Sequence, residues 1–188
     1  ALVALDAWLV AQLQPAAGNG RWADTPQAFT GTLRRAPYPT LRVEDNGAVR
    51  TYIVISDEKR GAEAALSGVA DGTSVTIQGY LIERAAVGMI QLAATGDDVA
   101  VADVPTVADA SREIHGAATL EGEIVDSKCW LGVMRPGDGH IHKACAALCI
   151  RGGIPPMFVT RGTDAPAVML LTKFDGGAVP PEKILDLV

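Results

Sequence analysis

Three cysteines and one histidine stand close together in the last third of this chain, and their types and spacing could bind a metal. The residues are Cys129, His142, Cys145 and Cys149. Thiolate sulfur and imidazole nitrogen are the donors that Zn²⁺, Cu(I) and iron–sulfur centres prefer. A helix turns about 100° per residue, so positions 142, 145 and 149 share one helical face. The spacing therefore predicts a metal site with Cys129 supplying the fourth donor from the preceding segment.

Three neighbouring residues are further candidate ligands. His140 cannot share the helical face of His142, so it is either a spare ligand or an exposed residue. Met134 and Met157 carry soft thioether sulfur, although filling gaps in a core is the commoner role of methionine. The pattern leaves the identity of the metal open between Zn, Cu and an iron–sulfur centre.

A disulfide is the alternative use of the same cysteines. In an exported chain two of the three would be expected to pair, which leaves one free thiol. Cys145 and Cys149 on one intact helix have poorly aimed Cβ vectors. Cys129 is the better partner for either of them, and a Cys129–Cys149 disulfide is the alternative to the metal site.

Two local resemblances accompany this segment. The spacing from Cys145 to Cys149 resembles the copper-binding loops of the CuA domain and of copper-delivery proteins for cytochrome oxidase. The CuA pattern places a histidine where this chain has Gly153 and a methionine a little further on, near Met157. The run DSKC…HxxCAxxC, which begins at Asp126, resembles an uncharacterised group of bacterial exported proteins. The resemblances imply copper binding and export respectively, and neither implies an activity.

The scaffold that must position these residues is predicted to be mainly β. The chain contains 20 Gly and 11 Pro among 188 residues, which favours many turns and little long helix. Five short apolar strands with a helical candidate at residues 62–66 are typical of a small Greek-key barrel of OB type. This first domain covers residues 29–92, with strands expected at residues 29–33, 41–43, 51–55, 74–82 and 88–92.

A weak internal repeat predicts a second OB-like barrel in tandem, at residues 119–188, after a linker at residues 93–118. Residues 120–124 and 168–172 resemble the first and third strands of the first copy. The second copy carries a Cys/His-rich helical insertion at residues 126–157. It also stops where its last two strands should follow, so this barrel is incomplete or is completed by other residues.

The first 28 residues are interpreted as an apolar helix and a linker. Residues 1–13 are apolar almost all round. They predict a helix that docks on the domain, or the remnant of a membrane anchor or signal segment. Thirteen residues rise about 20 Å, which is short of a bilayer core of about 30 Å.

Charge and composition exclude nucleic acid as a partner. Asp plus Glu exceed Lys plus Arg by 22 to 16, which gives a net charge of −6. Aromatic residues make up only 5%. An acidic chain with few aromatics is poorly suited to bind phosphate backbones or stack bases, whereas it suits a basic redox protein.

These observations predict an accessory subunit for metal binding or redox contact, with no catalytic activity of its own. We expect it on the extracytoplasmic, periplasmic side of a bacterial membrane complex. Its partner would be that complex or a basic redox protein, and residues 1–13 would supply any membrane contact. The alternative is a disulfide-stapled, OB-like protein-interaction module without metal.

Overall fold

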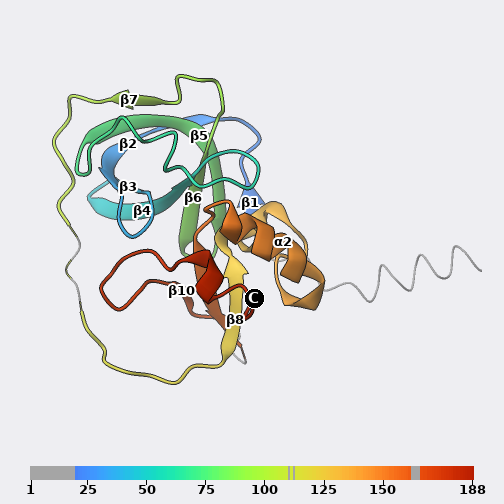
Figure 1. Ribbon diagram of the computed structural model, residues 1–188. Helices are drawn as coiled ribbons and strands as arrows, with labels where there is room; N and C mark the ends of the chain where they lie inside the picture. Colours follow the sequence, from blue (N-terminus) through green and yellow to red (C-terminus); the bar gives the residue numbers. More distant parts are fainter. Residues whose placement is uncertain (1–19, 110, 112, 162–165) are drawn as a thin grey trace, which may run out of the picture.

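The computed structural model describes residues 20–109, 111, 113–161 and 166–188. The helix expected at residues 1–13 lies outside them. The described chain is mainly β, as predicted, with two sheets and a small helical region (Figure 1). No helix among the described residues is long and apolar enough to cross a bilayer.

Five strands form a closed barrel, which confirms the fold predicted for the first domain. The order is β5–β2–β3–β4–β6, and pairing between β6 and β5 closes the sheet (Figure 1). The β4–β6 pair is parallel and the others are antiparallel. The five barrel strands are β2 (Gln27–Arg34), β3 (Thr40–Asp45), β4 (Ala48–Ile55), β5 (Ser74–Arg84) and β6 (Val87–Leu92).

Two short strands extend this sheet, and one predicted element is wrong. Strands β1 (Arg21–Trp22) and β7 (Val99–Val101) both pair with β5, and β7 lies within the segment expected to be a linker. Residues 62–69 form turns instead of the expected helix at 62–66. Nucleation of a helix is unfavourable, and a segment of one or two turns forms too few hydrogen bonds to offset it.

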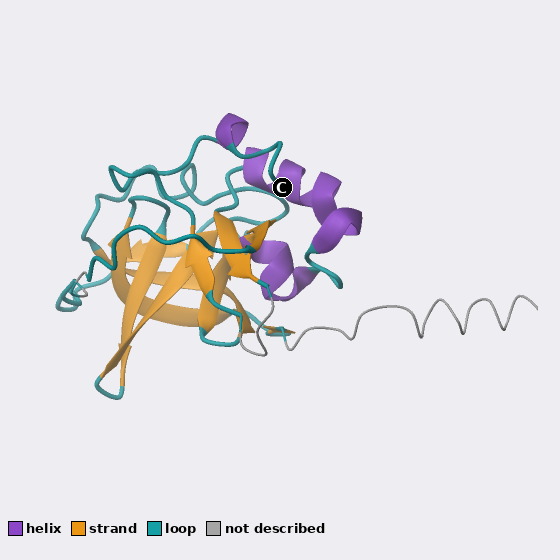
Figure 2. Cartoon of the chain, turned by 90° about the horizontal axis from the view of Figure 1, so that it is seen from below, coloured by secondary structure: helices purple, strands orange, loops and turns teal. Residues whose placement is uncertain are grey.

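Residues 119–188, which were predicted to form a second OB-like barrel, contain a three-stranded antiparallel sheet in the order β10–β9–β8. Its strands are β8 (Gly122–Asp126), β9 (Pro156–Thr160) and β10 (Val168–Leu170). Between β8 and β9 lie a short π-helical turn, η1 (Cys129–Val133), and α2 (Gly139–Arg151), and a 3-10 turn, η2 (Pro181–Lys183), follows β10. Figure 2 shows the helices gathered on one side of the barrel.

The Cys/His segment is held against the barrel by a shared apolar core. One cluster lies within the barrel, and a second joins barrel side chains such as Ile82 and Met89 to Trp130, Leu131 and Met157. Each large apolar side chain buried in this way contributes about 1.5–3 kcal/mol. Because the two units share this core, η1 and α2 have a defined position on the barrel.

A cation–π contact reinforces the same junction. The Arg84 guanidinium of β5 lies 4.1 Å from the ring centroid of Trp130, and its Nη1 donates a 2.9 Å hydrogen bond to the Trp130 carbonyl. Trp130 directly follows Cys129, so this contact fixes the start of η1 relative to the barrel.

Candidate metal centre

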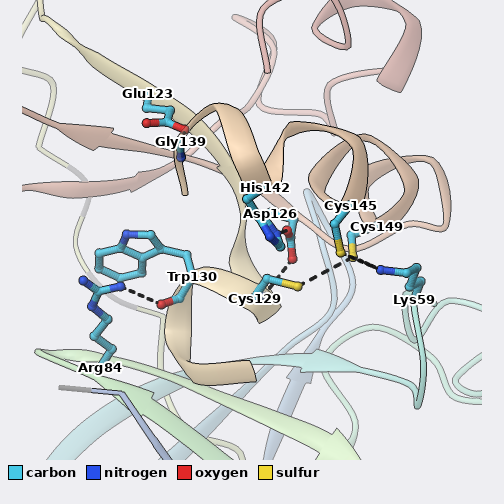
Figure 3. A network of polar contacts seen from close by, with 10 residues as sticks. All are labelled: Lys59, Arg84, Glu123, Asp126, Cys129, Trp130, Gly139, His142, Cys145 and Cys149. Carbon is cyan, nitrogen blue, oxygen red and sulfur yellow. Dashed lines mark hydrogen bonds and ion pairs between the residues drawn. The ribbon is translucent and has the colours of Figure 1, made fainter. Parts of the chain in front are cut away.

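The four predicted ligands converge where α2 crosses the start of η1 (Figure 3). The ligand atoms of Cys129, His142 and Cys145 lie within 4.8 Å of one another, and those of Asp126, Cys129 and Cys149 form a second such group. Cys129 belongs to both groups. The helix that was expected to carry positions 142, 145 and 149 on one face is α2, and this face is directed towards Cys129.

The sulfur atoms of Cys129 and Cys149 are already at the spacing of a metal site. They lie 3.9 Å apart. Two sulfurs on one tetrahedral Zn²⁺, each at a Zn–S distance of about 2.3 Å, are about 3.8 Å apart. The pair thus matches one edge of a tetrahedron before any metal is added.

The ligands differ in their access to solvent. The exposed fractions are 3% for Cys129, 1% for Cys149 and 4% for His142, whereas Cys145 is half-buried. The centre is therefore closed on three sides and accessible through Cys145.

Asp126 organises two of the ligands, a role that the sequence reasoning did not assign. Its fully buried carboxylate accepts a 3.0 Å hydrogen bond from His142 Nε2 and a 2.8 Å bond from the Cys129 backbone N–H. A carboxylate behind a metal-binding histidine orients the ring and fixes its tautomer. With Nε2 held by Asp126, Nδ1 is the nitrogen left to bind a metal. The signal available in the sequence was an aspartate at the end of an apolar strand, three positions before Cys129.

Lys59 is a second participant that the sequence did not reveal. It comes from the loop after β4, and its Nζ donates hydrogen bonds to Cys145 Sγ at 2.8 Å and to Cys149 Sγ at 3.4 Å. The bond to Cys145 raises the pKa of the Lys59 ammonium above its ordinary value. Since 86 residues separate Lys59 from Cys145, no local pattern could have linked them.

The Cys129–Cys149 pair is polarised. The hydrogen bond with Cys129, together with the Lys59 ammonium, lowers the pKa of Cys149 below its ordinary value, although burial opposes the shift. The same hydrogen bond, burial and the charge of Asp126 raise the pKa of Cys129. Because a thiolate is the form that binds metal, the lowered pKa favours Cys149 as the first of the three thiols to bind.

The three further candidate ligands lie in different surroundings. His140 is exposed on α2, and Met157 is fully buried in the shared apolar core. Met134 is 44% exposed and lines a cavity in front of the thiols. Among the described His, Cys, Asp and Glu side chains, His140 does not belong to either donor group.

The disulfide alternative is wrong for this structure. All three cysteines are free, and the Cys129 and Cys149 sulfurs are separated by 3.9 Å, well beyond the length of a covalent S–S bond. A hydrogen bond joins the two sulfurs instead.

The three thiols line a cavity of about 570 Å³. Its lining also includes the apolar side chains of Trp22, Val133 and Met134, together with Lys59 and Lys128. Lys128 is buried, which lowers the pKa of its amine, and its Nζ donates a 2.5 Å hydrogen bond to the Glu58 carbonyl.

Gly152 allows the end of α2 to touch the loop that carries Lys59. A Cβ at position 152 would collide with the Lys59 carbonyl oxygen, and the Gly152 carbonyl accepts a 2.9 Å hydrogen bond from the Gly61 N–H. We expect Gly152→Ala to push the loop away and to lower the free energy of unfolding by about 1–3 kcal/mol. Urea denaturation measures this loss, with Gly68→Ala, where a Cβ meets open space, as the control. Equal stability of the two variants would contradict the prediction.

Comparison with protein-family models, with curated proteins and with solved structures finds no match for this chain. The two resemblances noted in the sequence stay predictions. The functional interpretation therefore rests on the chemistry of the site.

Proposed function

We propose that this chain is a metal-binding accessory protein that holds one soft ion, Zn²⁺ or Cu(I), through three thiols and one imidazole. The ligands are Cys129, His142, Cys145 and Cys149. The observation that carries the proposal is the convergence of these donors in two overlapping groups that share Cys129, with one S–S spacing already that of a tetrahedral site. A buried carboxylate behind the histidine supports it further.

The electrostatic environment also suits a metal bound by thiolates. Three thiolates bring more negative charge than Zn²⁺ or Cu(I) neutralises, and the amines of Lys59 and Lys128 lie beside them. Buried charge is tolerated where opposite charge is close. We therefore assign the stabilisation of the loaded centre to the buried Lys128.

The same neighbourhood contains a cysteine, a histidine and an aspartate, the set used by thiol hydrolases. In such an enzyme the histidine must take the proton of the accessible thiol. Among the contacts of the described residues, Cys145 bonds to Lys59 and no hydrogen bond joins it to His142. Metal binding is therefore the better interpretation of these residues.

An extracytoplasmic location and a redox or membrane-complex partner complete the proposal. Their support is the acidic charge of −6, which suits a basic partner, and the resemblance of the DSKC…HxxCAxxC run to exported proteins. In that setting the protein would supply or hold a metal for the complex and carry out no reaction of its own.

Metal analysis of the reduced protein tests the proposal. After incubation with Zn²⁺ and gel filtration we expect about one equivalent per chain, and with Co²⁺ the intense absorption of thiolate-bound, tetrahedral cobalt. His140→Ala, which removes an exposed histidine from the same helix, should retain both signals. The proposal would be overturned if the folded protein retained no more than traces of Zn²⁺ and of Cu(I).

A further inference from the structure

The proposed centre opens onto a cavity at one of its ligands. Cys145 is half-buried, whereas Cys129, Cys149 and His142 are buried, and all three thiols line the cavity of about 570 Å³. A structural metal site is normally closed by its four protein ligands. Here an outside donor can approach the metal position from the side of Cys145.

The fold has apolar cores that do not depend on the centre. The cluster inside the barrel, with Leu33, Leu41 and Ile77 among its members, includes none of the four ligands. The second cluster contains Cys129 and Cys149, but it is built largely of aliphatic and aromatic side chains. Small metal-dependent domains, in contrast, need the metal to fold. We therefore expect this protein to stay folded when it releases the ion.

Lys59 is placed to stabilise a departing ligand. Its Nζ lies 2.8 Å from Cys145 Sγ, and a hydrogen bond from an ammonium to a thiolate is charge-assisted and strong. The side chain is exposed and belongs to the loop after β4, outside the ligand set. It can thus hold the Cys145 sulfur as a thiolate once that sulfur no longer binds the metal.

From these three features we infer that the metal is cargo, passed through the cavity to a thiol-bearing acceptor, with Cys145 as the ligand that exchanges. The inference rests on the proposed metal site and assigns its use. The acceptor's chemistry follows from the donors it must replace, because a soft ion held by thiolates is transferred most readily to other thiolates. The apolar side chains of Trp22, Val133 and Met134 would accommodate the carbon atoms around the incoming sulfur.

The exchange is one substitution of thiolate for thiolate. The acceptor sulfur donates an electron pair to the metal, and the bond between the metal and Cys145 Sγ breaks with its pair left on that sulfur. The ammonium of Lys59 hydrogen-bonds to the released thiolate. No electron is transferred and no oxidant is needed. The same substitution at Cys129 and Cys149, with release of the His142 imidazole as a neutral base, completes the transfer.

Transfer kinetics test this inference. Protein loaded with Zn²⁺ is mixed with excess dimercaptosuccinate under anaerobic conditions, and the Zn²⁺ left on the chain is measured after rapid gel filtration. We expect the rate to rise in proportion to acceptor concentration and circular dichroism to stay unchanged. Lys59→Met should slow the transfer by about tenfold, because the leaving thiolate loses a charge-assisted hydrogen bond. Lys143→Met, which removes an exposed lysine from α2, should transfer at the wild-type rate.

Alkylation identifies the exchanging ligand. In the loaded protein, iodoacetamide should modify Cys145 well before Cys129 or Cys149, as read by peptide mass mapping. A transfer rate independent of acceptor concentration, or equal alkylation of the three thiols, would overturn the inference. So would a Lys59→Met variant as fast as wild type. Failure of the metal site itself is recognised separately, since no Zn²⁺ would be present at the start.

Discussion

Cys129→Ser is expected to reduce bound Zn²⁺ from about one equivalent to below about a tenth, measured after gel filtration of the reduced protein. Cys129 belongs to both donor groups, and its sulfur lies 3.9 Å from that of Cys149. A serine hydroxyl is a hard, mostly protonated donor, so it does not replace a thiolate towards a soft ion. The change therefore removes the ligand that joins η1 to α2.

A second substitution in the same core provides the control. Met157→Leu keeps the volume of a buried side chain that packs in the cluster containing Cys129. It should retain the full equivalent, which would also remove Met157 from the set of possible ligands. Full metal content in folded Cys129→Ser protein would show that the ion, if bound, is held elsewhere.

Asp126→Asn is expected to weaken metal binding by about 10–100-fold, as found when residues that orient a ligand are changed. The carboxylate accepts hydrogen bonds from His142 Nε2 and from the Cys129 N–H. An asparagine can still accept the bond from the backbone, but its NH₂ group would face Nε2. The histidine would then carry its proton on Nδ1, the nitrogen needed by the metal.

Competition with a chromophoric chelator measures this change in affinity. Asp103→Asn makes the same chemical change at an exposed position away from the site and should bind as tightly as wild type. Thermal unfolding followed by circular dichroism establishes that each variant is folded. If Asp126→Asn bound the metal with wild-type affinity, the carboxylate would have a structural role and no role in metal binding.

Much of the scaffold could be predicted from local pattern. The short apolar runs in residues 29–92 predict five strands, and these close into a barrel around a common apolar core. One exception is the segment at residues 62–66, which forms turns because so short a helix is not stable by itself. Strand β9 was also missed, since it begins at the second of two prolines and lies across the end of the insertion, predicted at residue 157.

By itself, the sequence determined the ligand types and the helical face that presents them. The positions of His142, Cys145 and Cys149 on one face follow from the 3.6-residue turn of a helix, which depends only on neighbours in the chain. The tertiary structure decided the rest. It brought Lys59 to Cys145 across 86 residues and placed the Asp126 carboxylate behind His142. It also set Cys129 against Cys149 as free thiols and opened the cavity at Cys145. These features arise where the barrel and the second sheet share a core, and such long-range packing leaves no local pattern in the sequence.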